Sequence, residues 1–390
     1  MVALPDFQNT EIAFRAKTTG ELYRAKLLFQ SMGWPMFVKT GTLFLNTALT
    51  LRFPVRPIVR PTLFAHFCGG ESVEEAGSLS KKLESYRIGS VLDYSIEGQE
   101  QEADFDSTTT ELLKTIEFAC GNLLPFAVFK VTGIARFGLL EKKSAKQPLS
   151  PDETAEWARI VDRVLLLCQK AAQKKVCLLI DAEESWIQEA IDELAEFMMA
   201  RFNQNEPVIY HTLQMYRHDR YAYLEGLHHT ASSQGWQPGI KLVRGAYMEK
   251  ERLRASRLKQ VSPIHPDKKS TDQDYNKALS FCVKHHERIS LFAGTHNEAS
   301  SLYLCELMDK YKIHKDDIGV VFSQLLGMSD HISFNLAHSG YLVAKYVPYG
   351  PVRDALPYLF RRAEENSSIQ GQASREFDLL SSELERRRKG

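Results

Sequence analysis

The sequence predicts an α/β fold, a single (βα)8 TIM-type barrel with a helical N-terminal arm and a C-terminal helix capping the barrel mouth. Short apolar runs, often β-branched, recur eight times and alternate with stretches of helical periodicity. Such alternation is typical of a parallel sheet covered on both faces. Doubly wound sheets share the pattern, but eight units within about 270 residues and no domain break favour a barrel.

The eight apolar runs are the expected strands. They span Ile88–Tyr94, Phe126–Thr132, Val176–Ala182, Val208–Gln214, Ile240–Ala246, Ile289–Thr295, Gly319–Gln324 and Tyr341–Val347. The clearest helical stretches between them are Pro151–Lys174, Trp186–Phe202, Tyr221–Gln234, Tyr275–His286 and Glu298–Tyr311. The first of these has a strong start signal, because Ser150 can cap the helix and proline is favoured at the first helical position.

Polar residues at the strand ends are the third observation that predicts a barrel. One such residue lies at or near the end of each of seven expected strands: Lys130, Asp181, Gln214, Arg244, Thr295, Gln324 and Tyr346. In a barrel these ends converge on one face, where active sites are built. Because burying an unpaired charge is costly, charged residues within apolar runs indicate a functional site.

The chain is expected to have three parts. Residues 1–85 form the helical N-terminal arm, residues 86–370 the barrel, and residues 371–390 a basic C-terminal tail that forms a fraying surface helix. Two connections stand out. Glu97–Glu111 is predicted to be an acidic loop after the first strand, and Lys250–Gln273 a charged excursion after the fifth strand that could serve as a lid.

Composition excludes several classes of function. The formal net charge is zero, which argues against a nucleic-acid partner. The six cysteines have no CxxC spacing, so they indicate thiols in a reducing compartment, and no structural metal is expected. Neither a GxGxxG fingerprint after a strand nor a P-loop is present.

The N-terminal arm raises the question of a membrane. No signal peptide opens the chain, and the uncharged stretch Thr40–Leu51 is too short to span a bilayer. Residues 22–70 contain no acidic residue, whereas basic residues alternate there with large apolar ones. This pattern suits contact with an anionic membrane surface, although ordinary helices with basic outer faces would look the same. We expect a cytoplasmic enzyme, peripheral at the inner membrane, or one on the matrix side of the mitochondrial inner membrane with its presequence absent.

A stripe of polar groups is predicted near the C-terminus. Tyr358, Arg361, Arg362 and Glu365 are spaced at i, i+3, i+4 and i+7, which places them along one face of a helix. A guanidinium fork matches a carboxylate in two-point contact. The stripe therefore indicates a site for a small amino or hydroxy acid, or alternatively a solvated basic face with a core tyrosine.

Several motifs occur in order along the chain: Asp93-Tyr-Ser-Ile-Glu-Gly98, Phe129-Lys130-Val-Thr-Gly133, Ile180-Asp181-Ala-Glu183, Lys241-Leu-Val-Arg244-Gly-Ala-Tyr247-Met, Thr295-His296-Asn297, Gln324-Leu-Leu-Gly-Met328 and the segment from Tyr346 to Asn366. Together they resemble the signature of the flavin-dependent proline dehydrogenases over roughly residues 60 to 375. The resemblance implies FAD as cofactor and oxidation of L-proline to Δ1-pyrroline-5-carboxylate by hydride transfer to flavin N5. The acid-free arm and the missing nicotinamide motif add a quinone as the expected electron acceptor.

The resemblance also assigns roles on the substrate side. Arg361 and Arg362 are expected to bind the substrate carboxylate, and Glu365 to orient them. An ion pair between Lys130 and Asp181 is expected at the barrel mouth. The aromatic residues Tyr346 and Tyr358 would enclose the apolar ring.

On the cofactor side, a cation near N5 and N1 stabilises a reduced flavin. The residues expected to bind FAD are Gln214, Arg244, Gly245, Ala246, Tyr247, Thr295, His296, Asn297 and Gln324. Two positions depart from the usual family pattern: Leu213 stands before Gln214, and Leu326 occupies a position where some members have tyrosine.

Three other functions would fit parts of the sequence. In a hydroxyproline-oxidising branch of the family a serine replaces the tyrosine that is Tyr346 here. A barrel aldolase could use Lys130 as a Schiff-base nucleophile, but the expected neighbour Asp181 would favour its charged form. A cofactor-free protein that binds membranes or regulates would have little use for so many pocket charges.

Overall fold

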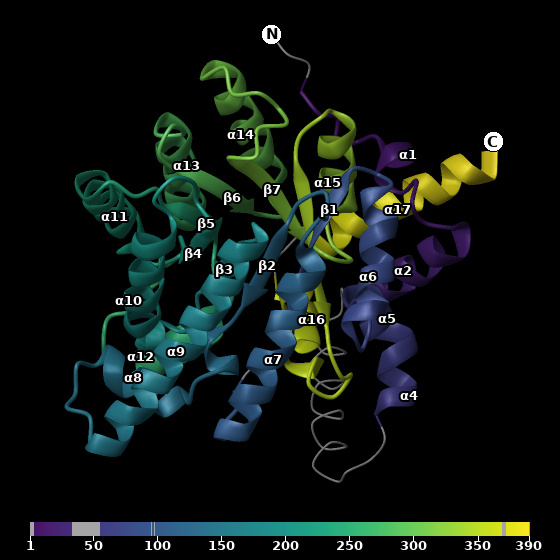
Figure 1. Cartoon of the computed structure of the whole chain (residues 1–390). Helices are drawn as coiled ribbons and strands as arrows, with labels where there is room; N and C mark the ends of the chain where they lie inside the picture. Colours follow the sequence, from purple (N-terminus) through teal and green to yellow (C-terminus); the bar gives the residue numbers. More distant parts are fainter. Residues whose placement is uncertain (1–3, 33–54, 95, 97, 369–371, 390) are drawn as a thin grey trace. The chain divides into compact units, whose positions relative to one another are not determined.

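The computed structural model describes residues 4–32, 55–94, 96, 98–368 and 372–389, and of residues 364–368 and 372–373 only the helical backbone. The described part contains eight strands that close into a barrel in sequence order (Figure 1). The strands are β1 (Ile88–Tyr94), β2 (Phe126–Phe129), β3 (Cys177–Ile180), β4 (Ile209–Gln214), β5 (Gly239–Val243), β6 (Ser290–Gly294), β7 (Val320–Leu325) and β8 (Val343–Tyr349). The pairs from β1–β2 to β6–β7 are parallel, so the predicted (βα)8 barrel is confirmed.

Helices follow the strands as predicted. They are α7 (Glu102–Ala119), α8 (Phe137–Ser144), α9 (Pro151–Lys174), α10 (Ser185–Phe202), α11 (Arg220–Gln234), α12 (Met248–Leu258), α13 (Lys268–Lys284), α14 (Glu298–Lys310), α15 (Asp330–His338), α16 (Leu356–Ser368) and α17 (Gln372–Lys389). Helix α9 begins as expected: the Ser150 hydroxyl accepts from the Glu153 backbone, and the Glu153 carboxylate accepts from the Ser150 backbone. This reciprocal capping satisfies two backbone donors that would otherwise lack partners.

The N-terminal arm is helical as expected in its described residues. It contains α1 (Thr10–Ala13), α2 (Thr19–Met32), α4 (Arg56–Val59), a π-helical turn (Arg60–Phe64), α5 (Ala65–Phe67) and α6 (Val73–Glu84). Part of the acid-free stretch, residues 33–54, lies outside the described residues. Within the described residues, no helix is long and apolar enough to cross a membrane.

Three predicted segments differ from the structure. The acidic loop expected at Glu97–Glu111 is wrong from residue 102 onward, where α7 begins. The excursion expected after β5 is mostly helical. Helix α12 continues to Leu258, and α13 begins at Lys268, where the Asp267 side chain caps it. The tail was expected to lie on the surface, but α17 packs into its unit, because Leu379, Leu380 and Leu384 are buried.

The chain divides into two compact units. The first comprises residues 91–323 with the first four residues, and the second combines residues 5–90 with 324–390. Aromatic rings fill the barrel interior of the first unit, where Phe126 lies 5.6 Å from Tyr210 and 5.1 Å from Phe292 between ring centroids. In the second unit, side chains of α2, α5, α16 and α17 share one apolar core. The boundaries predicted near residues 85 and 370, and the capping position of α16, stay predictions.

Candidate active site

Five polar residues of the first unit lie where sequence patterning places them. Lys130 directly follows β2, Asp181 follows β3, Gln214 ends β4, Arg244 follows β5 and Thr295 follows β6. Because these strands are parallel neighbours, their carboxyl ends lie at the same end of the barrel (Figure 1). The strand ends therefore bring these five residues to one face.

Four charged side chains form what we call the strand-end cluster: Asp93, Lys130, Asp181 and Lys241. The Lys130 ammonium lies 3.5 Å from a carboxylate oxygen of Asp93 and 3.5 Å from one of Asp181. The Lys241 ammonium donates to the other oxygen of Asp181. The predicted ion pair between Lys130 and Asp181 is thus present, and Asp93 and Lys241 extend it.

Burial and mutual attraction set the charge state of this cluster. Burial alone would raise the pKa of Asp181, but the ammonium groups of Lys241 and Lys130 outweigh it and hold that pKa below its ordinary value. Burial lowers the pKa of Lys241, although Asp181 opposes the shift. The result is a fixed carboxylate between two cations at the end of the barrel strands.

The Gln214 carboxamide is held at both ends. Its nitrogen donates to the Glu183 carbonyl at 2.7 Å, and its oxygen accepts from the Ala246 backbone at 3.2 Å. The Glu183 carboxylate is itself buried and accepts from the backbone and the hydroxyl of Thr132. These contacts connect the loops after β2, β3 and β5.

Arg244 organises the next strand ends. Its guanidinium donates to Asp272 at 2.6 Å, to the Thr295 hydroxyl at 2.6 Å and to the Ser300 hydroxyl at 2.9 Å. The Asn297 side chain caps α14 by accepting from the Ser300 backbone at 2.9 Å. A guanidinium beside the N-terminus of a helix suits the binding of phosphate.

The segment after Arg244 needs a glycine. Gly245 has φ +139°, and a Cβ there would lie 2.5 Å from the Tyr216 ring. The backbone therefore approaches that ring more closely than any side chain would permit. Tyr247 is buried with the Lys250 ammonium 5.4 Å from its ring centroid, whereas His296 is partly exposed after Thr295.

The second unit carries the remaining predicted residues. Gln324 lies in β7, where its side-chain oxygen accepts from the Ser333 hydroxyl at 2.7 Å. Tyr346 is buried in β8, which continues to Tyr349, two residues beyond the predicted strand end at Val347. The added pairing comes from Gly69, whose backbone donates to the Pro348 carbonyl at 2.7 Å.

The stripe near the C-terminus lies on α16 as predicted. Arg362 is only 6% exposed, and its guanidinium carbon lies 5.0 Å from the Tyr358 ring centroid. Arg361 is half-buried, and the side chain of Glu365 lies outside the described residues. The alternative of a solvated basic face is therefore wrong for Arg362, whereas Tyr358 does join the apolar core of its unit.

Sequence reasoning missed three residues of the first unit. Asp93, Glu183 and Lys241 were not predicted as site residues, although all three lie within motifs quoted above. Lys241 carried a usable signal, because a lysine inside an apolar strand must find an anionic partner. Glu183 offered none, since its partner Thr132 lies on another strand end.

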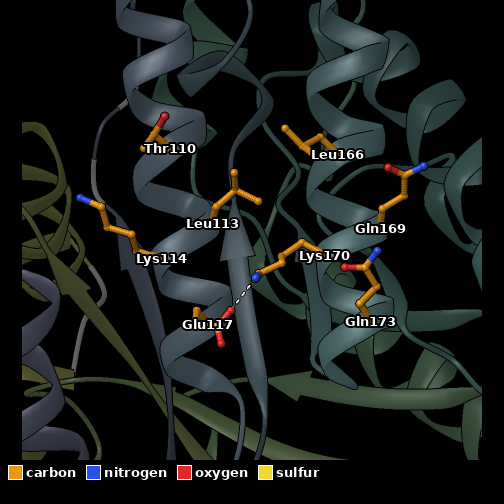
Figure 2. Close-up of a pocket in the computed structure, with 8 residues that line it drawn as sticks. All are labelled: Thr110, Leu113, Lys114, Glu117, Leu166, Gln169, Lys170 and Gln173. Atoms are coloured by element: carbon orange, nitrogen blue, oxygen red, sulfur yellow. Dashed lines mark ion pairs between the residues drawn. The ribbon is translucent and has the colours of Figure 1, made fainter.

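The first unit also has a surface groove that contains none of these site residues. It encloses about 460 Å³ between α7 and α9 and is lined by Thr110, Leu113, Lys114, Glu117, Leu166, Gln169, Lys170 and Gln173 (Figure 2). Figure 2 shows the ion pair between Lys170 and Glu117 across it, at 2.5 Å. None of the predicted site residues lines this groove.

Comparison with known proteins decides the family. A family model described as proline dehydrogenase matches residues 76–375. The chain belongs to the proline dehydrogenase family. It is therefore an oxidoreductase of that family, as the resemblance predicted.

Relatives that match this chain over most of their own length are found in bacteria and eukaryotes. The chain is 32% identical to proline dehydrogenase 1, mitochondrial, of Dictyostelium discoideum, over 97% of this chain and 74% of that one. It is 35% identical to the carbapenem antibiotics biosynthesis protein CarD of Pectobacterium carotovorum, over 82% and 83%. It is 31% identical to hydroxyproline dehydrogenase of Xenopus laevis, over 96% and 88%.

A solved structure shares the fold. The chain superposes with a TM-score of 0.74 on proline utilization A from Bdellovibrio bacteriovorus inactivated by N-propargylglycine. The match covers 96% of this chain and 40% of that longer chain, at 18% sequence identity. The likeness supports the barrel fold.

Proposed function

We propose that the chain uses FAD to oxidise L-proline to Δ1-pyrroline-5-carboxylate, the first step of proline catabolism. The strand-end cluster is the observation that carries the proposal beyond family membership. It fixes two ammonium groups beside Asp181 at the end of the barrel strands, and such neighbouring opposite charges suit a substrate that carries both a carboxylate and an ammonium group. Bound FAD would supply the acceptor for the hydride that leaves the ring carbon next to nitrogen.

The residues of the first unit fit a flavin nucleotide. The N-terminus of α14, capped by Asn297 and flanked by Arg244, offers donors for phosphate oxygens. The Thr212 hydroxyl is buried and has no hydrogen-bond partner among the described residues, and it is register partner to Lys241 on β5. A buried hydroxyl of this kind, with Gln214 two residues on along β4, is consistent with a polar ligand at this end of the barrel.

We assign the holding of FAD to the nine residues predicted for the cofactor. They are Gln214, Arg244, Gly245, Ala246, Tyr247, Thr295, His296, Asn297 and Gln324. Their combined chemistry, with one fixed carboxamide, one guanidinium, a glycine turn and a helix start, matches a ligand that has both an aromatic ring system and phosphates.

On the substrate side, Arg361 and Arg362 are proposed to clamp the proline carboxylate. Burial of Arg362 supports this role, because a desolvated guanidinium binds a carboxylate more strongly than an exposed one. Tyr346 and Tyr358 would enclose the ring, Lys130 and Asp181 would set the charge around it, and Glu365 would orient the arginines.

A quinone is proposed as electron acceptor, with membrane contact through residues 22–70. Tyr23, Leu27 and Ile58 of this stretch are more than half exposed, which suits an interfacial surface. However, Arg56 and Arg60 form ion pairs with Glu71 of the following segment, at 2.8 Å and 3.0 Å, which weakens the attraction to anionic lipids. Location at the bacterial or mitochondrial inner membrane stays part of this proposal.

The decisive experiment is an absorbance spectrum of the purified protein. The protein should bind FAD, show flavin absorbance, and bleach anaerobically when L-proline is added. A protein that binds no flavin, or whose flavin is not reduced by proline, would contradict the proposal. The Schiff-base aldolase would instead be trapped by borohydride, and its nucleophile Lys130 is disfavoured because two carboxylates lie 3.5 Å from it.

Hydroxyproline is the second candidate substrate, because one relative of similar length is a hydroxyproline dehydrogenase. The buried phenol of Tyr346 favours the smaller substrate, L-proline. Comparing kcat/KM for both substrates distinguishes the two. A wild-type preference for hydroxyproline would replace the proposed substrate without changing the proposed chemistry.

A further inference from the structure

The turn between β7 and α15 has an unusual backbone. Gly327 has φ +77°, and a Cβ there would lie 2.4 Å from the His66 carbonyl oxygen. Ser329, the residue before α15, has φ 51° and ψ 43°, a left-handed conformation that non-glycine residues rarely adopt. Such a backbone persists only where surrounding contacts hold it.

Lys345 of β8 supplies one set of those contacts. It is a fully buried lysine, and its ammonium donates to the Met328 carbonyl at 2.6 Å and the Leu325 carbonyl at 3.3 Å. Its third contact is the Asp330 carboxylate, at 2.8 Å. All three donors of the ammonium are thus directed at the turn and the first residue of α15.

Asp330 is held from a second side as well. Its other carboxylate oxygen lies 2.8 Å from the Lys17 ammonium of the N-terminal arm. Burial alone would raise the pKa of Asp330, but Lys17 and Lys345 hold it well below its ordinary value. The carboxylate also lies in the first turn of α15, where the helix dipole favours negative charge.

Glu376 of α17 completes the set. Its carboxylate is 3% exposed and accepts from the Ser329 backbone at 2.5 Å. In a capping box this bond comes from a Glu or Gln three residues into the same helix, but that position here is Ile332. Glu376 of the C-terminal helix therefore provides the acceptor for the Ser329 amide that the sequence of α15 lacks. We call Lys17, Asp330, Lys345 and Glu376 the helix-start cluster.

The turn leads directly to two residues of the proposed site. The Ser333 hydroxyl lies 3.2 Å from the Ser329 carbonyl and donates to the Gln324 side-chain oxygen at 2.7 Å. The Leu326 backbone donates to the Tyr346 carbonyl at 2.8 Å. Any shift of Ser329 is thus transmitted to the carboxamide of Gln324 and to the strand that carries Tyr346.

We propose that Glu376 is a positioning residue, which fixes the β7–α15 turn through Ser329 and thereby the orientation of Gln324 and Tyr346. The inference rests on the proposed function, because only there do Gln324 and Tyr346 contact cofactor or substrate. It assigns the C-terminal helix a part in catalysis rather than in stability alone.

Three variants at one position test the inference, with a matched control on the same helix. Glu376→Ala removes the acceptor for the Ser329 amide, Glu376→Asp withdraws it by one methylene, and Glu376→Gln keeps an acceptor oxygen. The control is Glu385→Ala, because Glu385 is an exposed carboxylate of α17. Hydrogen exchange of residues 326–333 is measured on each full-length protein, together with the flavin spectrum and kcat/KM for proline and hydroxyproline.

The alanine and aspartate variants should exchange faster in the turn and lose roughly tenfold in kcat/KM for proline, the equivalent of one hydrogen bond to a charged acceptor. Glu376→Gln should retain most of the activity, and Glu385→Ala all of it.

The inference is overturned by unchanged exchange in the turn. It is equally overturned if exchange rises while kcat/KM and the substrate ratio stay at the wild-type values, since the role is then purely structural. Should Glu376→Ala fail to fold, Glu376→Asp decides by the same criteria. A wild-type protein without flavin or proline turnover would refute the proposed function, whereas the exchange measurement would still decide whether Glu376 holds the turn.

Discussion

The two charge clusters of this chain have the same composition, but Lys130 of the strand-end cluster and Lys345 of the helix-start cluster differ in exposure and contacts. Each contains two lysines and two acidic residues. In the strand-end cluster, Lys130 is 14% exposed and lies 3.5 Å from both of its carboxylates. In the helix-start cluster, Lys345 is 1% exposed and directs its three donors at two carbonyls and one carboxylate. A partly exposed ammonium such as that of Lys130 lies within reach of a ligand, whereas the fully buried ammonium of Lys345 can only hold structure.

The comparison predicts different costs for losing a lysine. Lys345→Met should lower the free energy of unfolding by about 3–5 kcal/mol, because the carbonyls of Leu325 and Met328 lose their buried donor in addition to the loss of one cation beside Asp330. Lys130→Met should cost only about 1–2 kcal/mol, because Lys241 still pairs with Asp181. Urea denaturation of both variants measures the difference. Equal losses of unfolding free energy in the two variants would contradict the distinction drawn between Lys130 and Lys345.

The next effect concerns activity. Arg361→Met or Arg362→Met should reduce kcat/KM for proline. The loss of transition-state stabilisation should be about 2–4 kcal/mol, by the scale for charged hydrogen bonds and buried ion pairs. Flavin binding and the flavin spectrum should stay nearly unchanged, because neither arginine is assigned to the cofactor. Steady-state kinetics on the flavin-loaded variants measure the loss. Turnover within about threefold of wild type in both variants would remove the arginines from the carboxylate site.

A smaller effect is predicted for specificity. The buried phenol of Tyr346 leaves little room for a hydroxyl on the far ring carbon, and shape exclusion of this kind discriminates by about 1–3 kcal/mol. Tyr346→Ser should therefore shift the ratio of kcat/KM toward hydroxyproline. If the serine variant loses activity on both substrates equally, Tyr346 stabilises the neighbouring structure and does not select the substrate.

Much of the barrel could be predicted because its signals are local. β-branched apolar runs and a capping signal such as Ser150 depend only on neighbouring residues. Helix α7 was missed because serine and threonine usually indicate loops. Here the hydroxyls of Thr109 and Thr110 bond to carbonyls four residues back, which satisfies them inside a helix.

The site residues likewise divide into those with a local signal in the sequence and those whose contacts are between distant segments. Lys130 and Asp181 were predicted because each ends a strand, and strand ends meet on one face of any barrel. Glu376 could not be predicted, since its partner Ser329 lies 47 residues earlier and neither residue has an unusual sequence context. The end of β8 was missed for a similar reason, because its last residues pair with Gly69 and Gly70. Contacts between distant segments leave no periodic signal.

The smallest predicted effect is on stability against pH, and it tests whether the helix-start cluster acts as a set of fixed charges. The folded-state pKa of Asp330 is depressed by Lys17 and Lys345, so its contribution to stability is present above the unfolded-state pKa of about 4 and is lost as the pH falls through the lower, folded-state value. Wild type should thus be more stable than Asp330→Asn at pH 7 and pH 5, and the gap should narrow only below about pH 4, where the carboxylate of the unfolded chain begins to take up a proton while the native one stays ionised. Urea denaturation of both proteins at pH 7, 5 and 3.5 measures the gap, with Asp378→Asn on the exposed face of α17 as control. A gap that stays constant down to pH 3.5, or that narrows already between pH 7 and 5, would show that the charge of Asp330 is not what ties Lys17 and Lys345 to the start of α15.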